Sequence, residues 1–110
     1  MGQVIWTEPA LDDVQHILEY VSRDSVRYAE KLGDRFIESP LRLIDEPRTG
    51  WRVPEFDRDD VRELFVAPFR KIYAIRDDDC YVATVVHGSR DLPRWWRPDQ
   101  FQGIPESTRS

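Results

Sequence analysis

The chain has 110 residues, of which 40% are hydrophobic and 34% are charged, and its formal net charge is −5. This length accommodates one domain with a single core, and the composition is typical of a folded globular protein rather than a disordered one. A chain with a pI near 5.0 is poorly suited to hold nucleic acid, because that affinity comes mainly from lysine and arginine neutralising phosphates. We therefore expect a protein partner and no sequence-specific DNA binding by this chain alone, although the arginines of the second half could form a local basic patch.

Three features predict a cytoplasmic protein. No apolar run approaches the ~20 residues needed to span a membrane. The N-terminal segment MGQVIWTEPA lacks the basic end and the apolar run of a signal peptide. Cys80 is the single cysteine, which excludes an internal disulfide and a cysteine-built zinc site. Its position at the start of a predicted strand indicates a small core or rim residue.

The first half of the chain predicts a strand followed by two helices. Gln3–Trp6 suits an edge strand, and Thr7 is placed to cap a helix whose first turn tolerates Pro9. The apolar stripe of this helix consists of Ala10, Leu11, Val14, Ile17, Leu18 and Val21. Asp24 or Ser25 caps a second helix, whose stripe consists of Val26, Ala29, Leu32, Phe36 and Ile37. Two such helices joined by a few polar residues predict an antiparallel helical hairpin.

Pro40 falls inside the second helical pattern. Proline in a helix interior removes a hydrogen bond and clashes with the preceding turn. We therefore expect the helix to kink or stop there, with Leu41, Leu43 and Ile44 continuing the burial.

After Gly50 the periodicity changes from helix to strand. Runs rich in branched and aromatic residues predict a three-stranded antiparallel meander of Val61–Val66, Phe69–Arg76 and Cys80–His87. The expected architecture is therefore α+β, with the N-terminal strand and the helical hairpin packed on an antiparallel sheet.

Both faces of the middle strand carry apolar side chains. Successive residues of a strand point to opposite faces, so Phe69, Tyr73 and Ile75 share one face while Ile72 and Ala74 share the other. The helical hairpin can cover one face only. The second face is expected to need a cover that the chain up to Asp91 does not supply, as at a partner-binding surface.

The order of these elements resembles the RelE/ParE superfamily of toxins from bacterial type II toxin–antitoxin modules. The motifs VIWTEPALDDVQHILEYV, GWRVPEF, VREL, FRKIYAI and VVHGSRDL, which lie between Val4 and Leu92, look like the ParE-type branch, often labelled plasmid stabilisation proteins. The resemblance implies a RelE/ParE-like domain over residues 1–92. Residues 93–110 would form a C-terminal extension, with the stretch after Ile104 disordered.

The superfamily divides by mechanism. RelE-like members cut mRNA in the ribosome, which requires proton transfer and cations on the phosphate; for that activity the candidates are His87 as proton carrier and Arg70 and Arg90 as phosphate clamps. ParE-like members poison DNA gyrase and are not known to need catalytic residues of their own. In the plainer structural interpretation His87 ends its strand and Arg90 pairs with nearby acids. Motifs and charge together favour a gyrase poison without catalytic residues, with the nuclease and a non-toxic antitoxin-binding protein as alternatives.

The expected partners are therefore a cognate antitoxin and gyrase, and a homodimer or a hetero-oligomer with the antitoxin is compatible with the sequence. In the simplest register Phe69 lies opposite His87, and Arg70 points to the other face; a one-residue slip would reverse this relation, so the sequence leaves the register open. The partner-binding candidates are Phe69, Lys71, Tyr73, His87, Arg90, Trp95 and Trp96.

No cofactor and no metal are expected. The two histidines, His16 and His87, are far apart in sequence, and Asp77–Asp79 lacks the spacing of a calcium loop. The acidic segment with Glu55, Asp57, Asp59 and Asp60 is most simply a solvated connection.

Overall fold

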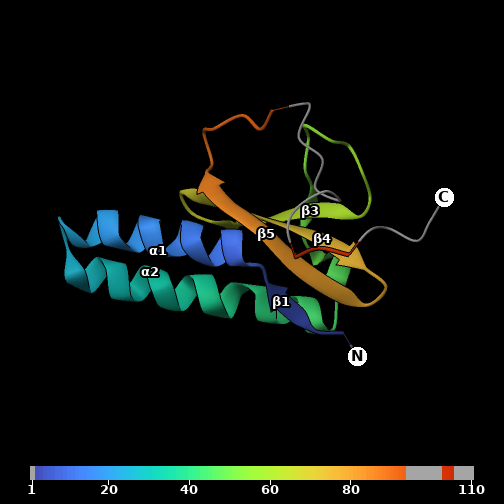
Figure 1. Cartoon of the computed structure of the whole chain (residues 1–110), viewed down its shortest axis with the longest axis horizontal. Coiled ribbons are helices and arrows are strands. Elements are labelled where there is room, and N and C mark those ends of the chain that lie inside the picture. The colour runs from blue at the N-terminus through green and yellow to red at the C-terminus, as the bar shows by residue number, and fades with distance from the viewer. Residues whose placement is uncertain (1, 94–102, 106–110) are drawn as a thin grey trace.

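Two helices pack on one side of a five-stranded mixed sheet with the strand order β1-β5-β4-β3-β2 (Figure 1). The computed structural model describes residues 2–93 and 103–105. Its elements are β1 (Val4–Trp6), α1 (Glu8–Ser22), α2 (Val26–Glu38), the 3₁₀ helices η1 (Ser39–Ile44) and η2 (Pro47–Thr49), β2 (Trp51–Arg52), β3 (Val61–Val66), β4 (Phe69–Arg76) and β5 (Asp79–His87). The predicted α+β class, the helical hairpin and the meander are confirmed. Within the described residues, no helix has the length and apolarity needed to cross a membrane.

Both helices begin where the sequence places a cap. The Thr7 hydroxyl accepts from the Ala10 amide at 3.3 Å, and Ser25, rather than Asp24, accepts from the Tyr28 amide at 3.1 Å. A side-chain oxygen at this position satisfies an amide that has no partner within the helix. Thr7 also donates to the Val82 carbonyl at 2.7 Å, so the same residue begins α1 and ties it to β5.

Pro40 ends the second helix as predicted. The helix α2 stops at Glu38, and the chain continues as the tighter helix η1 with Pro40 in its first turn. Leu43 is fully buried under the sheet, whereas Leu41 is 54% exposed. The expectation that Leu41 continues the buried stripe was wrong, because the change to a 3₁₀ helix alters the side-chain spacing.

The β4–β5 pairing has one register shift, between Ile72 and Tyr73, which leaves Ala83 as an extra residue on β5. Phe69 is opposite His87, and Arg70 is opposite Val86 and points to the other face. Two edge strands extend the sheet: β1 runs parallel to β5, and the two-residue strand β2 pairs with β3. The sheet is mixed because β5, which the chain reaches only after the helical hairpin and the strands β2 to β4, lies beside β1 and runs in the same direction.

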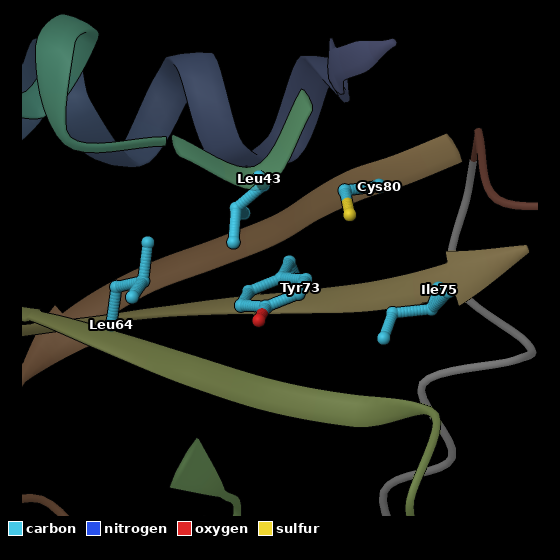
Figure 2. Packing of buried hydrophobic residues seen from close by; sticks show 5 residues of the cluster. All are labelled: Leu43, Leu64, Tyr73, Ile75 and Cys80. Atoms are coloured by element: carbon cyan, nitrogen blue, oxygen red, sulfur yellow. The ribbon is translucent and has the colours of Figure 1, made fainter. Parts of the chain in front are cut away.

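The face of the sheet toward the helices carries two apolar clusters. Leu32, Phe36, Val66 and Val85 form one of them. Leu43 from η1 and Leu64, Tyr73, Ile75 and Cys80 from three strands form the other, with Tyr73 between them (Figure 2). The prediction that Cys80 is a small core residue is confirmed, and burial raises the pKa of its thiol to about 11.

The opposite face, which we call the outer face, is covered by the chain itself. Its apolar residues Ile72 and Ala74 are fully buried. The covering side chains come from the β2–β3 connection and from the segments after β5, namely Val53, Phe56, Leu92 and Ile104. The expectation that residues up to Asp91 supply no cover was therefore wrong. The β2–β3 connection has no periodicity that could have indicated it.

Acidic residues hold this connection in place. Asp59 accepts from Arg48 at 2.9 Å, Arg62 at 2.7 Å and Arg52 at 3.2 Å. These hydrogen bonds lower the pKa of the Asp59 carboxyl, and the bond with Arg48 has the largest effect. Asp60 pairs with Arg58 at 2.8 Å and with Arg76 at 3.1 Å. The segment predicted as a solvated connection is instead the outer cover of the sheet.

Gly50 gives the first testable prediction. A Cβ atom built there would lie 2.6 Å from the Glu63 carbonyl oxygen and 2.6 Å from the Tyr73 hydroxyl. Gly50→Ala is expected to lower the free energy of unfolding by about 1–3 kcal/mol, because backbone and ring must move apart. Gly33→Ala is the control: it lies inside α2 with only Leu18 side-chain atoms nearby and should stabilise the protein by about 0.5–1 kcal/mol. Urea denaturation measures both, and equal effects would contradict the close approach at Gly50.

Candidate functional site

The end of β5 carries the residues that the sequence singled out. His87 is exposed at the last position of the strand, and its ring packs edge to face on Phe69 with centroids 5.8 Å apart. Its Nδ1 accepts from the Ser89 amide at 3.2 Å and lies 2.7 Å from the Ser89 hydroxyl. The neutral imidazole therefore carries its proton on Nε2. The Nδ1 of His87 thus holds the following turn.

That turn is shaped by a close backbone contact. The Gly88 amide donates to the Pro68 carbonyl at 2.7 Å, and a Cβ at Gly88 would lie 2.9 Å from that oxygen. The Arg90 amide donates to the His87 carbonyl at 3.0 Å. The Arg90 side chain is exposed. The glycine is needed here because a side chain would separate the two segments.

Arg70 does not join His87. Its side chain is only 6% exposed and lies on the outer face, where it forms ion pairs with Glu55 at 2.8 Å and Glu63 at 2.6 Å. A third bond joins its Nη1 to the Arg90 carbonyl at 3.1 Å. A guanidinium with two carboxylates has no free positive charge for a phosphate. The structure therefore separates the Arg70 guanidinium from the His87 side chain, whereas His87 and Arg90 are both exposed in the same turn.

The two carboxylates of this network respond differently to their surroundings. Hydrogen bonds from Arg70 lower the pKa of Glu55 to about 2, and Glu55 also accepts from the Leu92 amide at 2.9 Å. Burial raises the pKa of Glu63 by more than its bond with Arg70 lowers it. The hydrogen bonds with Glu55 and Glu63, of which the bond with Glu55 has the larger effect, raise the pKa of Arg70. The network is thus a buried structural element that connects β3, β4, the β2–β3 connection and the segment after β5.

Lys71 and Tyr73 are in the core on the helix-facing side. The Lys71 ammonium donates to the Phe36 carbonyl at 2.7 Å and to the Ser39 hydroxyl, and lies 5.3 Å from the centre of the Trp6 ring. Burial lowers the pKa of Lys71 to about 7. Tyr73 donates to the Pro47 carbonyl at 2.7 Å and accepts from the Gly50 amide at 3.0 Å. Both side chains attach the end of α2 and the following connection to the sheet.

Among the described residues, the partner-binding candidates thus differ in accessibility. His87 and Arg90 are exposed, Phe69 is half-buried against Phe36, and Lys71 and Tyr73 have no exposed surface. Trp95 and Trp96 lie outside the described residues. Their role in binding a partner stays a prediction. The described residues contain no group of three or more side chains that could hold a metal ion.

Sequence reasoning missed a second surface, at the free edge of β3. There Trp51 and Phe65 are 72% and 57% exposed. An open hollow of about 300 Å³ adjoins Phe65, and its lining includes Arg35, Ser39 and Arg42. A strand of two residues is too short for periodicity to reveal, and alternation alone does not distinguish an exposed Phe65 from a buried one.

Comparisons with known proteins agree with this fold. The family described as "ParE toxin of type II toxin-antitoxin system, parDE" matches residues 4–92. Among solved structures, the chain is similar to one described as "Chromosomal ParDE TA system from P. aeruginosa", with a TM-score of 0.65 and 21% sequence identity. That match covers 79% of this chain and 96% of the other, and at this identity it is a likeness of fold. No curated protein matches the sequence.

The Arg70 network gives a prediction about stability. Arg70→Met leaves two buried carboxylates without their partner and is expected to lower the free energy of unfolding by roughly 3–5 kcal/mol. Arg90→Met, at an exposed position, should change it by less than about 0.5 kcal/mol. Adding Glu63→Leu to Arg70→Met should recover part of the loss, because one unpaired charge is removed. Equal, small effects of Arg70→Met and Arg90→Met in urea denaturation would disprove a structural role for Arg70.

Lys71 gives a prediction about pH. Its pKa of about 7 in the folded protein lies below the ordinary 10.5, so between these values the unfolded chain binds more protons than the folded one. Stability contributed by this group therefore rises as the pH increases from about 7 to 9. In Lys71→Met this contribution is absent, so the free energy of unfolding of the variant relative to that of the wild type should be highest near pH 7 and fall as the pH becomes alkaline. Urea denaturation at several pH values measures the difference, and parallel pH profiles would contradict the assignment.

Proposed function

We propose a target and a regulator for this chain, which belongs to the ParE toxin family of type II toxin–antitoxin systems. It acts in the cytoplasm as a toxin that poisons DNA gyrase, and a cognate antitoxin neutralises it. The main observation in support of gyrase as the target is that the Arg70 guanidinium is buried and paired with Glu55 and Glu63. RNA cleavage needs cations that stabilise the charge developing on the phosphate. A toxin without such a cluster is better suited to a protein target.

The charge of the chain supports the same choice. Its formal net charge is −5, and the resulting field opposes the approach of a polyanion such as mRNA. Several arginines of the second half are held in ion pairs: Arg48, Arg52 and Arg62 all contact Asp59, and Arg52 also lies 3.7 Å from Asp57. A target that is itself a protein does not require a basic surface.

The antitoxin is proposed from family membership. The solved structure of similar fold is described as a ParDE toxin–antitoxin system, and we extend that pairing to this chain. Antitoxins of this kind carry an arm that folds on binding and covers apolar surface of the toxin. The exposed apolar side chains here include Leu11, Ile37, Trp51 and Phe65.

Inhibition of gyrase tests the proposal directly. Purified protein is expected to inhibit negative supercoiling of relaxed plasmid by gyrase or to trap cleaved DNA with the enzyme, and its induction in cells should trigger the DNA-damage response. The purified antitoxin should reverse the inhibition. Codon-dependent mRNA cleavage in a ribosome-containing extract, with supercoiling untouched, would identify the nuclease alternative instead. Antitoxin binding without either activity would identify a non-toxic binding partner.

His87→Gln separates proton transfer from scaffolding at the end of β5. Glutamine keeps a hydrogen-bonding side chain for the Ser89 turn but cannot act as a general acid or base. A nuclease that used His87 would lose about 100- to 10,000-fold in rate, whereas a gyrase poison should keep most of its toxicity. Growth inhibition and supercoiling assays measure the outcome, with His16→Gln, at the exposed histidine of α1, as the matched control. Full loss of toxicity at an unchanged melting temperature would contradict the gyrase proposal.

A further inference from the structure

The edge of β3 is only partly covered by β2. Pairing between the two strands covers Trp51 opposite Glu63 and Arg52 opposite Arg62, and Val53 beyond them donates to the Val61 carbonyl at 3.3 Å. The backbone groups of alternate residues point to the same side of a strand. The N–H and C=O of Phe65 therefore point to the same side of β3 as those of Val61, which face β2. At Phe65, however, β2 has not yet begun, because its first residue, Trp51, is opposite Glu63. Phe65 pairs with Arg70 of β4 on one side, but in the described part of the chain no strand pairs with it on the β2 side, and such an edge is a template for a strand from another chain.

Two exposed aromatic side chains lie on the outer-face side of this edge. Trp51 is opposite Glu63 and shares its face, which is also the face of Phe65 two residues further along β3. Diagonal neighbours of this kind have Cα atoms roughly 7–8 Å apart, within reach of aromatic rings. Their exposed fractions of 72% and 57% are large for rings of this size, and tryptophan is over-represented among residues that anchor interfaces.

The helix side of the same edge is basic. Arg35, Glu38, Ser39 and Arg42 line the open hollow of about 300 Å³ together with Phe65 and Val66. The arginines of the outer cover are paired with carboxylates, but within the described residues Arg35 and Arg42 form no ion pair. Two arginines and one glutamate leave a local excess of positive charge on an acidic protein. A carboxylate from a partner would complement them.

We propose that the edge of β3 binds an extended segment of the antitoxin in which apolar and acidic residues alternate. This inference rests on the proposed antitoxin pairing and deepens it. The segment is added as a strand in line with β2, and its backbone pairs with the N–H and C=O of Phe65. Because successive side chains of a strand point to opposite sides, every second side chain packs on Trp51 and Phe65. The side chains between them place a carboxylate between Arg35 and Arg42.

A second copy of this chain fits the edge less well than the antitoxin does. A two-fold axis at Phe65 would bring together Arg35 and Arg42 of both copies, and like charges brought together at an interface are unfavourable. Each copy also carries a net charge of −5, so association is opposed over longer distances as well. A segment with its own carboxylates satisfies the arginines without this repulsion.

The test uses the purified toxin with the antitoxin encoded beside its gene, and with peptides that tile the C-terminal half of that antitoxin. Arg35→Glu combined with Arg42→Glu is expected to weaken binding by about tenfold or more, and Trp51→Ala combined with Phe65→Ala should have a similar effect. The matched control for charge is Arg23→Glu combined with Arg27→Glu, which lie away from the hollow. Tyr20→Ala, a 69% exposed aromatic residue, is the control for ring loss. Both controls should keep wild-type affinity.

Two further readouts distinguish binding from a loss of folding. Hydrogen exchange at the Phe65 amide of the wild-type toxin should slow on addition of the antitoxin, because that amide gains a backbone acceptor. The affinity of the wild-type toxin for the antitoxin should fall with added salt, and the affinity of the arginine variant should fall less. The melting temperature of the arginine variant should equal that of the wild type.

The outcomes separate this inference from the proposed function. If the antitoxin binds the wild type but is insensitive to both edge variants and leaves the Phe65 amide unprotected, the assignment of the edge is wrong and the antitoxin pairing stands. If the arginine variant changes the oligomeric state of the free toxin while antitoxin affinity is unchanged, the edge joins two copies instead. If the antitoxin does not bind the wild-type toxin, the antitoxin pairing itself fails.

Discussion

Arg70 and its two carboxylates connect the parts of the protein that the backbone alone would leave apart. Glu63 comes from the neighbouring strand β3, Glu55 comes from the β2–β3 connection, and the segment after β5 is attached through the Arg90 carbonyl and the Leu92 amide. A buried arginine is tolerated only when its donors are satisfied, and the loss of one member of such a network costs more than the loss of a surface pair. This guanidinium therefore joins both parts of the outer cover, the β2–β3 connection with Val53 and the segment with Leu92.

The same interaction bears on the chemistry at the end of β5. The VVHGSRDL motif supplies a histidine and an arginine in positions that suit phosphate chemistry, but the neighbouring Arg70 faces the other side of the sheet and is already paired. His87 in turn holds the turn through Ser89. In this protein the residues of the motif form the turn after β5 and attach the following segment to the sheet. We therefore favour a protein target for this toxin.

The polar side chains have two different roles, one in the interior of the protein and one at its surface. Inside the protein, Lys71, Tyr73 and Arg70 satisfy backbone carbonyls or carboxylates and attach connections to the sheet. At the edge of β3, Arg35 and Arg42 are left without an acidic partner in the described residues, beside exposed aromatic rings. Paired charges that are buried contribute structure, whereas accessible unpaired charges next to apolar surface are available for recognition.

The sequence by itself determined the elements whose signals are local: the cap at Thr7, the start of the second helix at Asp24 or Ser25, its kink or stop at Pro40 and the strands of the meander. Spacing, capping and turn chemistry act over a few residues, so the order of residues is sufficient to predict them. Only the tertiary structure decided that Glu55 and Asp59 hold the outer cover, that Lys71 is buried, and that the edge beside Phe65 is free. These properties depend on which distant side chains meet and on how much water remains around them, and neither quantity is encoded in the spacing of residues along one segment.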